Sequence, residues 1–345
     1  MKIGKVSVNV LKRTVLRQIR TKREEVVNGA GVGVDCAIFS FSGDEAVVSC
    51  MQEAPVCTDR TDADKSGDDG AEQLFTVTQL IHKCANNLAV SGAEPVAVML
   101  ALLLPKELEE PVLKELMAEA ENCCHELHMQ IAGGQTRVSA TVRNPVAVVT
   151  GYGKVLKKTC RTPKAAAPGQ DVVISKWIGL EGTALLAGKY REKLLQRYPA
   201  YLVEEAEGFD RYLSIIREAA TAVKSGVCAM HDASQGGIFG ALWELAEAAG
   251  VGLTIDLKKL PLRQETVEVC ECCNVNPYEL LSGGCLVMTS EDGSALVAAL
   301  LAENIPAVVV GKVTDSNDRI LINEDEIRYM DRPKNDEIYG GLNEA

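Results

Sequence analysis

The sequence is poor in aromatic residues, has no excess of positive charge and contains no long apolar run. Phe, Trp and Tyr make up 4% of the 345 residues, which argues against platforms for stacked nucleic-acid bases. The net charge of −12 also argues against a nucleic-acid binder, because phosphate contacts need a basic surface. The longest apolar run, 96–104, lies between two prolines and is far shorter than the ~20 residues of a membrane span. We therefore expect neither nucleic acid nor a membrane as a partner.

An export signal is also missing from the start of the sequence, where basic and apolar residues alternate. A signal peptide needs an apolar core there. The twelve cysteines would suggest a disulfide framework in a small secreted domain, but without an export signal reduced thiols are the better interpretation. The sequence thus predicts a cytoplasmic protein.

Length and periodicity predict two domains of α/β (α+β) architecture, because strand and helix patterns alternate in both halves. Residues 157–170 hold two prolines and no apolar periodicity, which is typical of a domain boundary. We therefore place an N-terminal domain at 1–156 and a C-terminal domain at 157–345. Apolar residues 96–104 predict a buried strand, and charged residues 190–208 predict an irregular segment.

A glycine-rich turn stands between two expected strands near the start of the chain. Its residues 29–35 read Gly-Ala-Gly-Val-Gly-Val-Asp. Glycines let the backbone approach a ligand and leave N–H groups open to phosphate oxygens. The turn is not a Walker A loop, because no Gly-Lys-Ser/Thr follows, and a strand follows where a dinucleotide fingerprint needs a helix. A plain tight turn between strands explains it equally well.

Two further motifs combine glycine with side-chain amides. Asn86 and Asn87 come near the end of an expected helix, before the small-residue turn 91–93. A helix C-cap explains the turn but not the paired amides. The second motif, Gly133-Gly134-Gln135-Thr136, stands between two expected strands.

The last motif, residues 230–237, reads Met-His-Asp-Ala-Ser-Gln-Gly-Gly, where a strand ends and a helix begins. Free backbone N–H groups at the two glycines would suit an anion at the helix N-terminus. The alternative is that Asp232 or Ser234 is a simple N-cap.

These four motifs, in this order and spacing, resemble the superfamily of aminoimidazole ribonucleotide (AIR) synthetase, the PurM-like proteins. The superfamily includes thiamine-monophosphate kinase, selenophosphate synthetase and the hydrogenase maturation factor HypE, and the sequence resembles HypE most. Residues 86–95 match a pattern that typically reads Asn-Asp-Leu-Ala, small residues, Gly-Ala-x-Pro. Residues 133–136 match Gly-Gly-Asp-Thr, and residues 33–37 match the end of a Gly-Asp-Asp-Ala-Ala loop. Residues 179–183 and 231–237 extend the likeness into the second half.

The resemblance implies two PurM-like domains, the first of which dimerises through its strands. It implies ATP as the cofactor in a cleft near the dimer contact, and it leaves Mg²⁺ open. Phosphoryl transfer in this superfamily activates an oxygen or selenium atom, which in HypE is the oxygen of a thiocarboxamide that is dehydrated to a thiocyanate. The nucleotide-binding residues that it implies are Gly31, Gly33, Asp35, Asn86, Asn87, Gly133, Gly134, Gln135 and Thr136. The residues that it places in the substrate cleft are His231, Asp232, Gly236 and Gly237, and Asp35 is the implied metal ligand.

The sequence departs from the family pattern at the acids that bind metal. Asn87 and Gln135 stand where Asp is usual, and Val34 replaces the first Asp of the Asp-Asp pair, so that only Asp35 remains. Amides would weaken a Mg²⁺ site, because this ion prefers carboxylate and phosphate oxygens. Residues 341–345 also lack the cysteine that HypE carries at its C-terminus. The HypE thiocyanate reaction is therefore not carried over from the resemblance alone.

Two functions stay open on the sequence. The first is an ATP-dependent enzyme that activates a carbonyl or amide-type oxygen of a small-molecule or protein maturation substrate. The second is a nucleotide-binding scaffold or regulatory protein that has lost catalysis. The missing acids favour the second, and the glycine loops favour ligand binding under either. In both cases we expect a homodimer.

Overall fold

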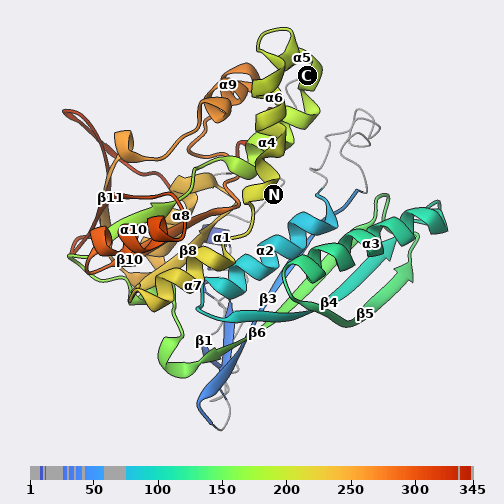
Figure 1. Ribbon diagram of the computed structural model, residues 1–345, viewed down its shortest axis with the longest axis horizontal. Helices are drawn as coiled ribbons and strands as arrows, with labels where there is room; N and C mark the ends of the chain where they lie inside the picture. The colour runs from blue at the N-terminus through green and yellow to red at the C-terminus, as the bar shows by residue number, and fades with distance from the viewer. Residues whose placement is uncertain are drawn as a thin grey trace.

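The structure is a computed structural model that describes residues 8–10, 12, 26–28, 31–34, 36–40, 43–57, 75–332 and 335–342. It contains two β-sheets, one from each half of the chain, with helices packed against both (Figure 1). The first sheet contains β1 (Val26–Asn28), β2 (Ala37–Ser40), β3 (Glu45–Pro55), β4 (Glu94–Leu104), β5 (Gln130–Val138) and β6 (Val146–Leu156). The second contains β7 (Asp171–Ser175), β8 (Ala229–Ala233), β9 (Gly252–Asp256), β10 (Cys285–Ser290), β11 (Ala307–Thr314), β12 (Arg319–Asn323) and β13 (Glu326–Tyr329).

The α-helices cover these sheets and the space between them. In chain order they are α1 (Val8–Val10), α2 (Val77–Ala89), α3 (Glu110–Glu126), α4 (Leu180–Lys189), α5 (Arg191–Leu195), α6 (Ala200–Glu207), α7 (Ile216–Lys224), α8 (Gly237–Ala249), α9 (Gln264–Cys273), α10 (Gly293–Ala302) and α11 (Ile338–Gly341). The mixed α/β architecture in two units agrees with the sequence prediction.

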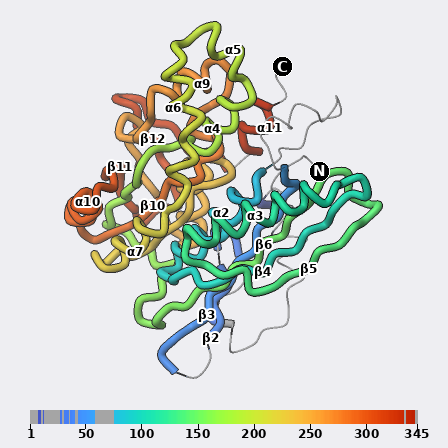
Figure 2. The backbone as a smooth tube through the Cα atoms, turned by 45° about the vertical axis from the view of Figure 1, so that its right-hand side comes forward, coloured from blue at the N-terminus to red at the C-terminus, as the bar shows by residue number. Residues whose placement is uncertain are grey.

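Within the part of the chain that the structure describes, helices cover one face of the first sheet. Its strand order is β1-β2-β3-β6-β4-β5, and α2 and α3 lie side by side on the same face (Figures 1 and 2). Along β3 the side chains alternate, so that Val48 and Cys50 are buried while Val47 and Met51 are exposed. Successive side chains of a β-strand point to opposite faces of the sheet, which produces this alternation. The other face of the sheet, which no described helix covers, is therefore partly exposed and partly apolar.

Helix α2 begins and ends where its sequence dictates. The Thr76 hydroxyl accepts a hydrogen bond from the Gln79 N–H, and the Gln79 side chain accepts one from the Thr76 N–H, which is a capping box. Leu80, Ile81, Cys84 and Leu88 recur at helical spacing and are buried against the sheet.

The second sheet has the order β13-β12-β9-β11-β7-β10-β8 and carries a core on each face. Helix α8 packs on one face, where Trp243, Leu253 and Val287 belong to one buried cluster. Helices α7 and α10 pack on the other, around Met230 and Leu286. Because β7, β8 and β10 are covered on both faces, their residues are buried almost without alternation.

Two expectations from the sequence need correction. The apolar run 96–104 lies in β4, but this strand is buried on one side only, and Val96 and Met99 are 42% and 39% exposed. Residues 190–208 contain two helices, α5 and α6, joined by a turn, because Leu194 and Val203 pack inward while most charged side chains face solvent. A short, charged helix buries only a few apolar residues, so the apolar periodicity that predicts a helix is weak in such a segment.

No helix within the described ranges has the length and apolar character that a membrane crossing requires. All twelve cysteines are free thiols, as the sequence predicts. The cytoplasmic location stays a prediction.

Helix α2 also joins the two halves of the chain through buried polar contacts. The Asn86 side chain donates to the Leu213 carbonyl at 2.8 Å and accepts from the Ile215 N–H at 3.0 Å. One turn earlier, the Lys83 ammonium lies 3.2 Å from the Glu181 carboxylate of α4. Buried polar groups are costly unless they are paired, so these contacts hold the halves in one arrangement.

A second buried ion pair lies beside this junction. The Lys176 ammonium is 2.6 Å from the Glu218 carboxylate, and both side chains are less than 8% exposed. The ammonium also donates to the carbonyls of Tyr212 and Ser214. Its charge acts on His82 of α2, whose pKa is lowered to about 4 by burial and, to a smaller extent, by Lys176.

We predict that Glu218→Gln lowers the free energy of unfolding by about 3–5 kcal/mol, because it leaves the buried Lys176 ammonium without its counter-charge. Chemical denaturation measures this loss. The matched control is Glu326→Gln, which breaks an exposed ion pair with Arg328 and is expected to cost less than about 1 kcal/mol. Equal losses in the two variants would contradict the prediction.

We predict that His82 makes stability depend on pH between about 6.5 and 4. Its pKa is lower in the folded protein than the ~6.5 of the unfolded chain. The unfolded chain therefore binds a proton that the folded protein does not, and stability falls as the pH falls through this window. Denaturation measures the free energy of unfolding at pH 7 and at pH 4.5. Between these two pH values, the unaltered protein is expected to lose about 2–3 kcal/mol more of this free energy than His82→Gln does.

The same comparison with His125→Gln, a change of an exposed histidine on α3, serves as the control and should show no such difference. Burial raises the pKa of Asp336 to about 6. The contribution of Asp336 to the stability of the protein therefore grows as the pH falls through the same window. The difference between each variant and the unaltered protein removes its contribution, and a zero difference for His82→Gln would refute the assignment.

Candidate functional site

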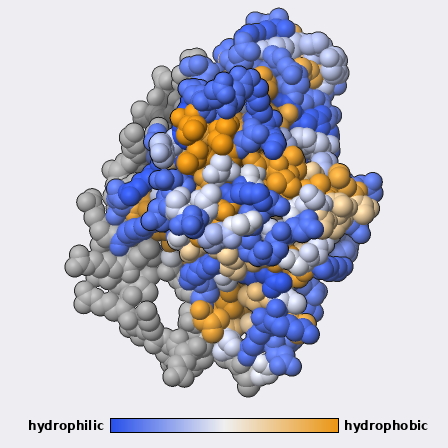
Figure 3. All heavy atoms as spheres, turned by 90° about the vertical axis from the view of Figure 1, so that its left-hand side faces the viewer, coloured by the Kyte–Doolittle hydropathy of each residue, from blue (hydrophilic) through white to orange (hydrophobic). Residues whose placement is uncertain are grey.

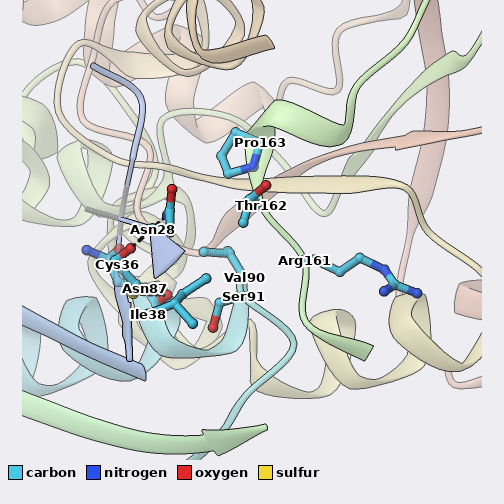
Figure 4. A pocket seen from close by; sticks show the side chains of 9 residues that line it. All are labelled: Asn28, Cys36, Ile38, Asn87, Val90, Ser91, Arg161, Thr162 and Pro163. Carbon is cyan, nitrogen blue, oxygen red and sulfur yellow. Dashed lines mark hydrogen bonds between the residues drawn. The ribbon is translucent and has the colours of Figure 1, made fainter. Parts of the chain in front are cut away.

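A small pocket lies where the first sheet, the end of α2 and the segment after β6 meet (Figure 4). Its free volume is about 10 Å³, which is about the room that one water molecule needs. The lining residues are Asn28, Cys36, Ile38, Asn87, Val90, Ser91, Arg161, Thr162 and Pro163. In Figure 4 the Arg161 side chain extends away from the others, and its Nε donates to the Val227 carbonyl at 2.8 Å.

The glycine turn approaches this pocket from β1 and β2. Asn28 of β1 donates from its side chain to the Cys36 carbonyl at 3.1 Å, the bond dashed in Figure 4. Gly33 has φ +67°, and a Cβ there would lie 2.2 Å from the Glu244 carbonyl oxygen of α8. Only glycine permits this contact, so the turn is packed against the second half of the chain. Asp35, the implied metal ligand, lies outside the described residues.

The two neighbouring amides of α2 have different surroundings. Asn86 is 2% exposed, and its amide is bonded to the backbone at 213 and 215. Asn87 is half-buried and lines the pocket, and its backbone carbonyl accepts a hydrogen bond from the Cys36 thiol. Asn87 is thus brought next to the strands of the glycine turn, while the Asn86 side chain joins the two halves of the chain.

The motif at residues 133–136 lies inside strand β5 and not in a loop between two strands, which corrects the expectation. The reason is close packing, because a Cβ on Gly134 would lie 1.8 Å from the Leu100 carbonyl of β4. Gln135 and Thr136 are exposed on this edge strand. Four strands separate β5 from β1 in the sheet. Within one chain, the implied nucleotide-binding residues therefore form two separate groups.

The residues implied for a substrate cleft lie in β8 and the turn that follows it. His231 and Asp232 are 1% and 4% exposed, so they belong to the interior. The His231 Nε2 atom is 3.2 Å from a carboxylate oxygen of Glu244 on α8. The backbone N–H of Gly236 donates to the Asp336 carboxylate at 2.6 Å.

Asp336 and Lys83 are charged groups of this region that the sequence did not single out. Burial raises the pKa of Asp336 to about 6, against the opposing effect of backbone N–H groups and of the Lys83 charge. Lys83 also lies 3.9 Å from the centre of the Phe75 ring. The sequence does hold a signal for Lys83, because this lysine stands between Ile81 and Cys84 on the apolar side of an expected helix. Residues 333–338, Pro-Lys-Asn-Asp-Glu-Ile, contain no comparable signal for Asp336.

None of the described residues that line the pocket carries a carboxylate for Mg²⁺. Among the residues that the structure describes, no group of three or more His, Cys, Asp or Glu side chains could hold a metal ion. The Lys164 ammonium donates to the Asn28 amide oxygen at 3.0 Å, and the Cys36 thiol donates to the Asn87 carbonyl at 2.7 Å. Amide oxygens are also weaker ligands for this ion than carboxylates.

Comparisons of sequence place this geometry among known proteins. Residues 33–155 match the AIR synthase related protein, N-terminal domain, and residues 167–323 match its C-terminal domain. A hydrogenase expression/formation protein of Methanocaldococcus jannaschii is 26% identical over 69% of this chain and 70% of that protein. The carbamoyl dehydratase HypE of Rhodobacter capsulatus is 29% identical over 66% of each chain. The chain thus spans about two thirds of the length of these relatives.

Solved structures share the fold. The hydrogenase maturation protein HypE in complex with ATP has a TM-score of 0.69 at 18% identity, over 98% of both chains. A HypE–HypF complex has a TM-score of 0.69 at 20% identity, over 88% of this chain and 94% of that one. Together with the two domain matches, which cover most of the sequence, these findings show that the chain belongs to the AIR synthase related proteins, the PurM-like superfamily that includes HypE.

Proposed function

We propose that the protein is an ATP-dependent enzyme that activates an amide-type oxygen in a maturation reaction. The relatives named carbamoyl dehydratase HypE support this proposal, as does the HypE structure with ATP. Phosphoryl transfer to a primary amide oxygen makes it a leaving group. Its departure, with loss of both amide protons, leaves a nitrile, ADP and phosphate. Catalysis of this kind depends on holding the phosphates and the acceptor in line.

The observation that carries the proposal is the meeting of three segments in one pocket. The strands of the glycine turn, Asn87 of α2 and residues 161–163 line it together. Gly31 and Gly33 belong to the turn between these strands, where backbone N–H groups would meet phosphate oxygens. As proposed nucleotide-binding residues we keep Gly31, Gly33, Asp35, Asn86, Asn87, Gly133, Gly134, Gln135 and Thr136.

We propose that Mg²⁺ plays a smaller part here than a carboxylate-held ion would. The amides Asn87 and Gln135 carry no charge toward a cation, and Asp35 is the one acid of the family's metal-binding pattern that the sequence retains. ATP would then be held mainly by backbone N–H groups and the amides.

A homodimer formed through the first sheet would complete this site. Gln135 and Thr136 lie at the edge opposite β1, so a second chain has to supply them if both groups contact one nucleotide. The open face of the sheet offers the apolar surface for such a contact. Its exposed apolar side chains are Val27, Val47, Met51, Val96, Met99, Tyr152 and Leu156.

The acceptor is proposed to be carried by a maturation protein or a small molecule that bears a carbamoyl-type group. The HypE–HypF complex supports a protein partner. His231, Asp232, Gly236 and Gly237 are the residues proposed for its cleft. A scaffold without catalysis is less well supported, because the relatives carry an enzyme's name.

Calorimetric titration with ATP, with and without Mg²⁺, tests the proposal. We expect binding in both conditions, with a difference of less than about tenfold in Kd, or 1.4 kcal/mol. The double variant Asn87→Asp, Gln135→Asp should enlarge the Mg²⁺ effect beyond tenfold, because each carboxylate adds a charge for the cation. Asp35→Asn should lower ATP affinity mainly when Mg²⁺ is present.

Asn323→Asp, which adds one charge at an exposed position of β12, is the control and should leave the Mg²⁺ effect unchanged. Release of ADP in the presence of a primary amide distinguishes the enzyme from the scaffold. Absence of ATP binding in every condition would overturn the proposal.

We predict that the protein is a dimer at micromolar concentration and that Met51→Glu with Met99→Glu makes it monomeric. Met51 and Met99 both pair with Thr150 of β6, so they lie in one row across the open face. Burying two unpaired carboxylates there costs several kcal/mol. Sedimentation measures the state, and the control changes two exposed apolar residues elsewhere, Tyr201→Glu with Leu301→Glu. A monomeric unaltered protein would contradict the prediction.

A further inference from the structure

The segment that joins the two halves of the chain is basic, although the protein as a whole carries a net charge of −12. Residues 157–164 read Lys-Lys-Thr-Cys-Arg-Thr-Pro-Lys, with four cationic side chains and no acid. The segment reaches the pocket beside the glycine turn, because Arg161, Thr162 and Pro163 line that pocket. It therefore brings positive charge to the place where we propose that the phosphates of ATP bind.

The two cations at this end of the segment have different partners. Arg161 is held by the backbone, because its Nε donates to the Val227 carbonyl at 2.8 Å and its guanidinium also donates to carbonyls of its own segment. The exposed Lys164 ammonium donates to the Asn28 amide oxygen at 3.0 Å. Within the described ranges, this neutral amide is the one polar group bonded to Lys164. The charge of Lys164 is thus not neutralised by a described acid.

Packing on α8 holds Lys164 beside the glycine turn. Pro163 is buried, and Ala166 belongs to the apolar cluster of α8, against which Val32 of the turn also packs. Asn28, the partner of Lys164, is buried and directly precedes the turn 29–35. The ammonium is therefore anchored next to a turn whose glycines leave backbone N–H groups open to an anion.

A larger groove in the second half of the chain holds its cations differently. Its free volume is about 440 Å³, and strands β7, β9, β11 and β12 contribute to its lining. Strand β11 lies on the side of the molecule that faces the viewer in Figure 3, where apolar and hydrophilic side chains are mixed. Both lysines of the groove are paired with acids, Lys312 with Asp171 at 2.7 Å and Lys259 with Asp256 at 3.6 Å. The groove is roomier than the pocket, but its positive charge is already neutralised.

We propose that Lys164 binds the phosphate groups of the nucleotide and supplies part of the positive charge that a carboxylate-held Mg²⁺ would supply. This inference rests on the proposed function, because it places the phosphates at the glycine turn. None of the described residues that line the pocket carries a carboxylate. A cation of the protein itself then takes over charge that a metal ion with several acidic ligands would bring.

The chemistry of a lysine side chain suits this role. An ammonium has three N–H donors, so the bond to Asn28 leaves two for phosphate oxygens. The Asn28 amide carries no net charge and holds the ammonium in place without neutralising it. A carboxylate in the same position would compete with the phosphates, because charge-assisted hydrogen bonds are the stronger ones. The flexible stem of Lys164 also lets the ammonium follow the phosphates.

Calorimetric titration with ATP in the absence of Mg²⁺ tests the proposal. Lys164→Gln keeps a hydrogen-bond donor for Asn28 and removes the charge. It is expected to weaken ATP binding about tenfold or more, because hydrogen bonds to charged groups are strong. Lys164→Arg keeps the charge and should stay within about threefold of the unaltered protein. The loss in Lys164→Gln should also shrink as the salt concentration rises, because salt screens exposed charges.

The control is Lys259→Gln, which removes an exposed lysine from the groove and should leave ATP binding unchanged. The proposal is overturned if Lys164→Gln binds ATP as the unaltered protein does, or if Lys259→Gln weakens binding instead. It is also overturned if Lys164→Gln and Lys164→Arg weaken binding equally, because the side chain then only braces Asn28. In each of these cases the unaltered protein still binds ATP, whereas failure of the proposed function shows as no ATP binding at all.

Discussion

Helix α2 makes the contacts on which the rest of this structure depends, because it packs on the first sheet and holds the second half of the chain at once. Its apolar stripe covers the sheet, and its polar side chains Lys83 and Asn86 are buried against α4 and residues 213–215. Apolar contact alone tolerates sliding, whereas buried hydrogen bonds and ion pairs are satisfied in one geometry. This helix therefore fixes where the glycine turn stands relative to α8.

The interior beside α2 is unusually rich in charge for a buried region. Lys83, Lys176, Glu181, Glu218 and Asp336 are all less than 9% exposed. Each is expensive to dehydrate, and pairing repays this cost only in good geometry. Stability here depends on the arrangement of opposite charges and not on their number. Such an interior is also where an incoming anion has the largest electrostatic effect, because water screens little there.

The first sheet has the opposite character. Among the described residues, helices cover one face, and the other carries exposed apolar side chains on the neighbouring strands β3, β6 and β4. Isolated exposed apolar residues are common on proteins, but a row across several strands indicates contact with another surface. The amide motif of β5 is exposed at the same sheet's edge. The proposed dimer would therefore complete the proposed nucleotide site through this same sheet.

The sequence by itself determined the fold class, the main strands and helices and the family, because these follow from local periodicity and from motifs in a given order. The change from strand to helix at residues 230–237 needed only neighbouring residues to be recognised. The sequence could not determine which face of β4 is buried, since an apolar run looks the same whether one or both faces are covered.

Only the tertiary structure decided where the motif residues lie. The amides Asn86 and Asn87 are adjacent in sequence, yet one joins the halves of the chain and the other lines a pocket, because successive helix positions point about 100° apart. Glycines 133 and 134 suggest a loop, but the close approach of β4 makes them part of a strand. Asp336 becomes a ligand of the Gly236 turn through contacts across 100 residues. No local pattern records such a contact, because it forms only when the whole chain is folded.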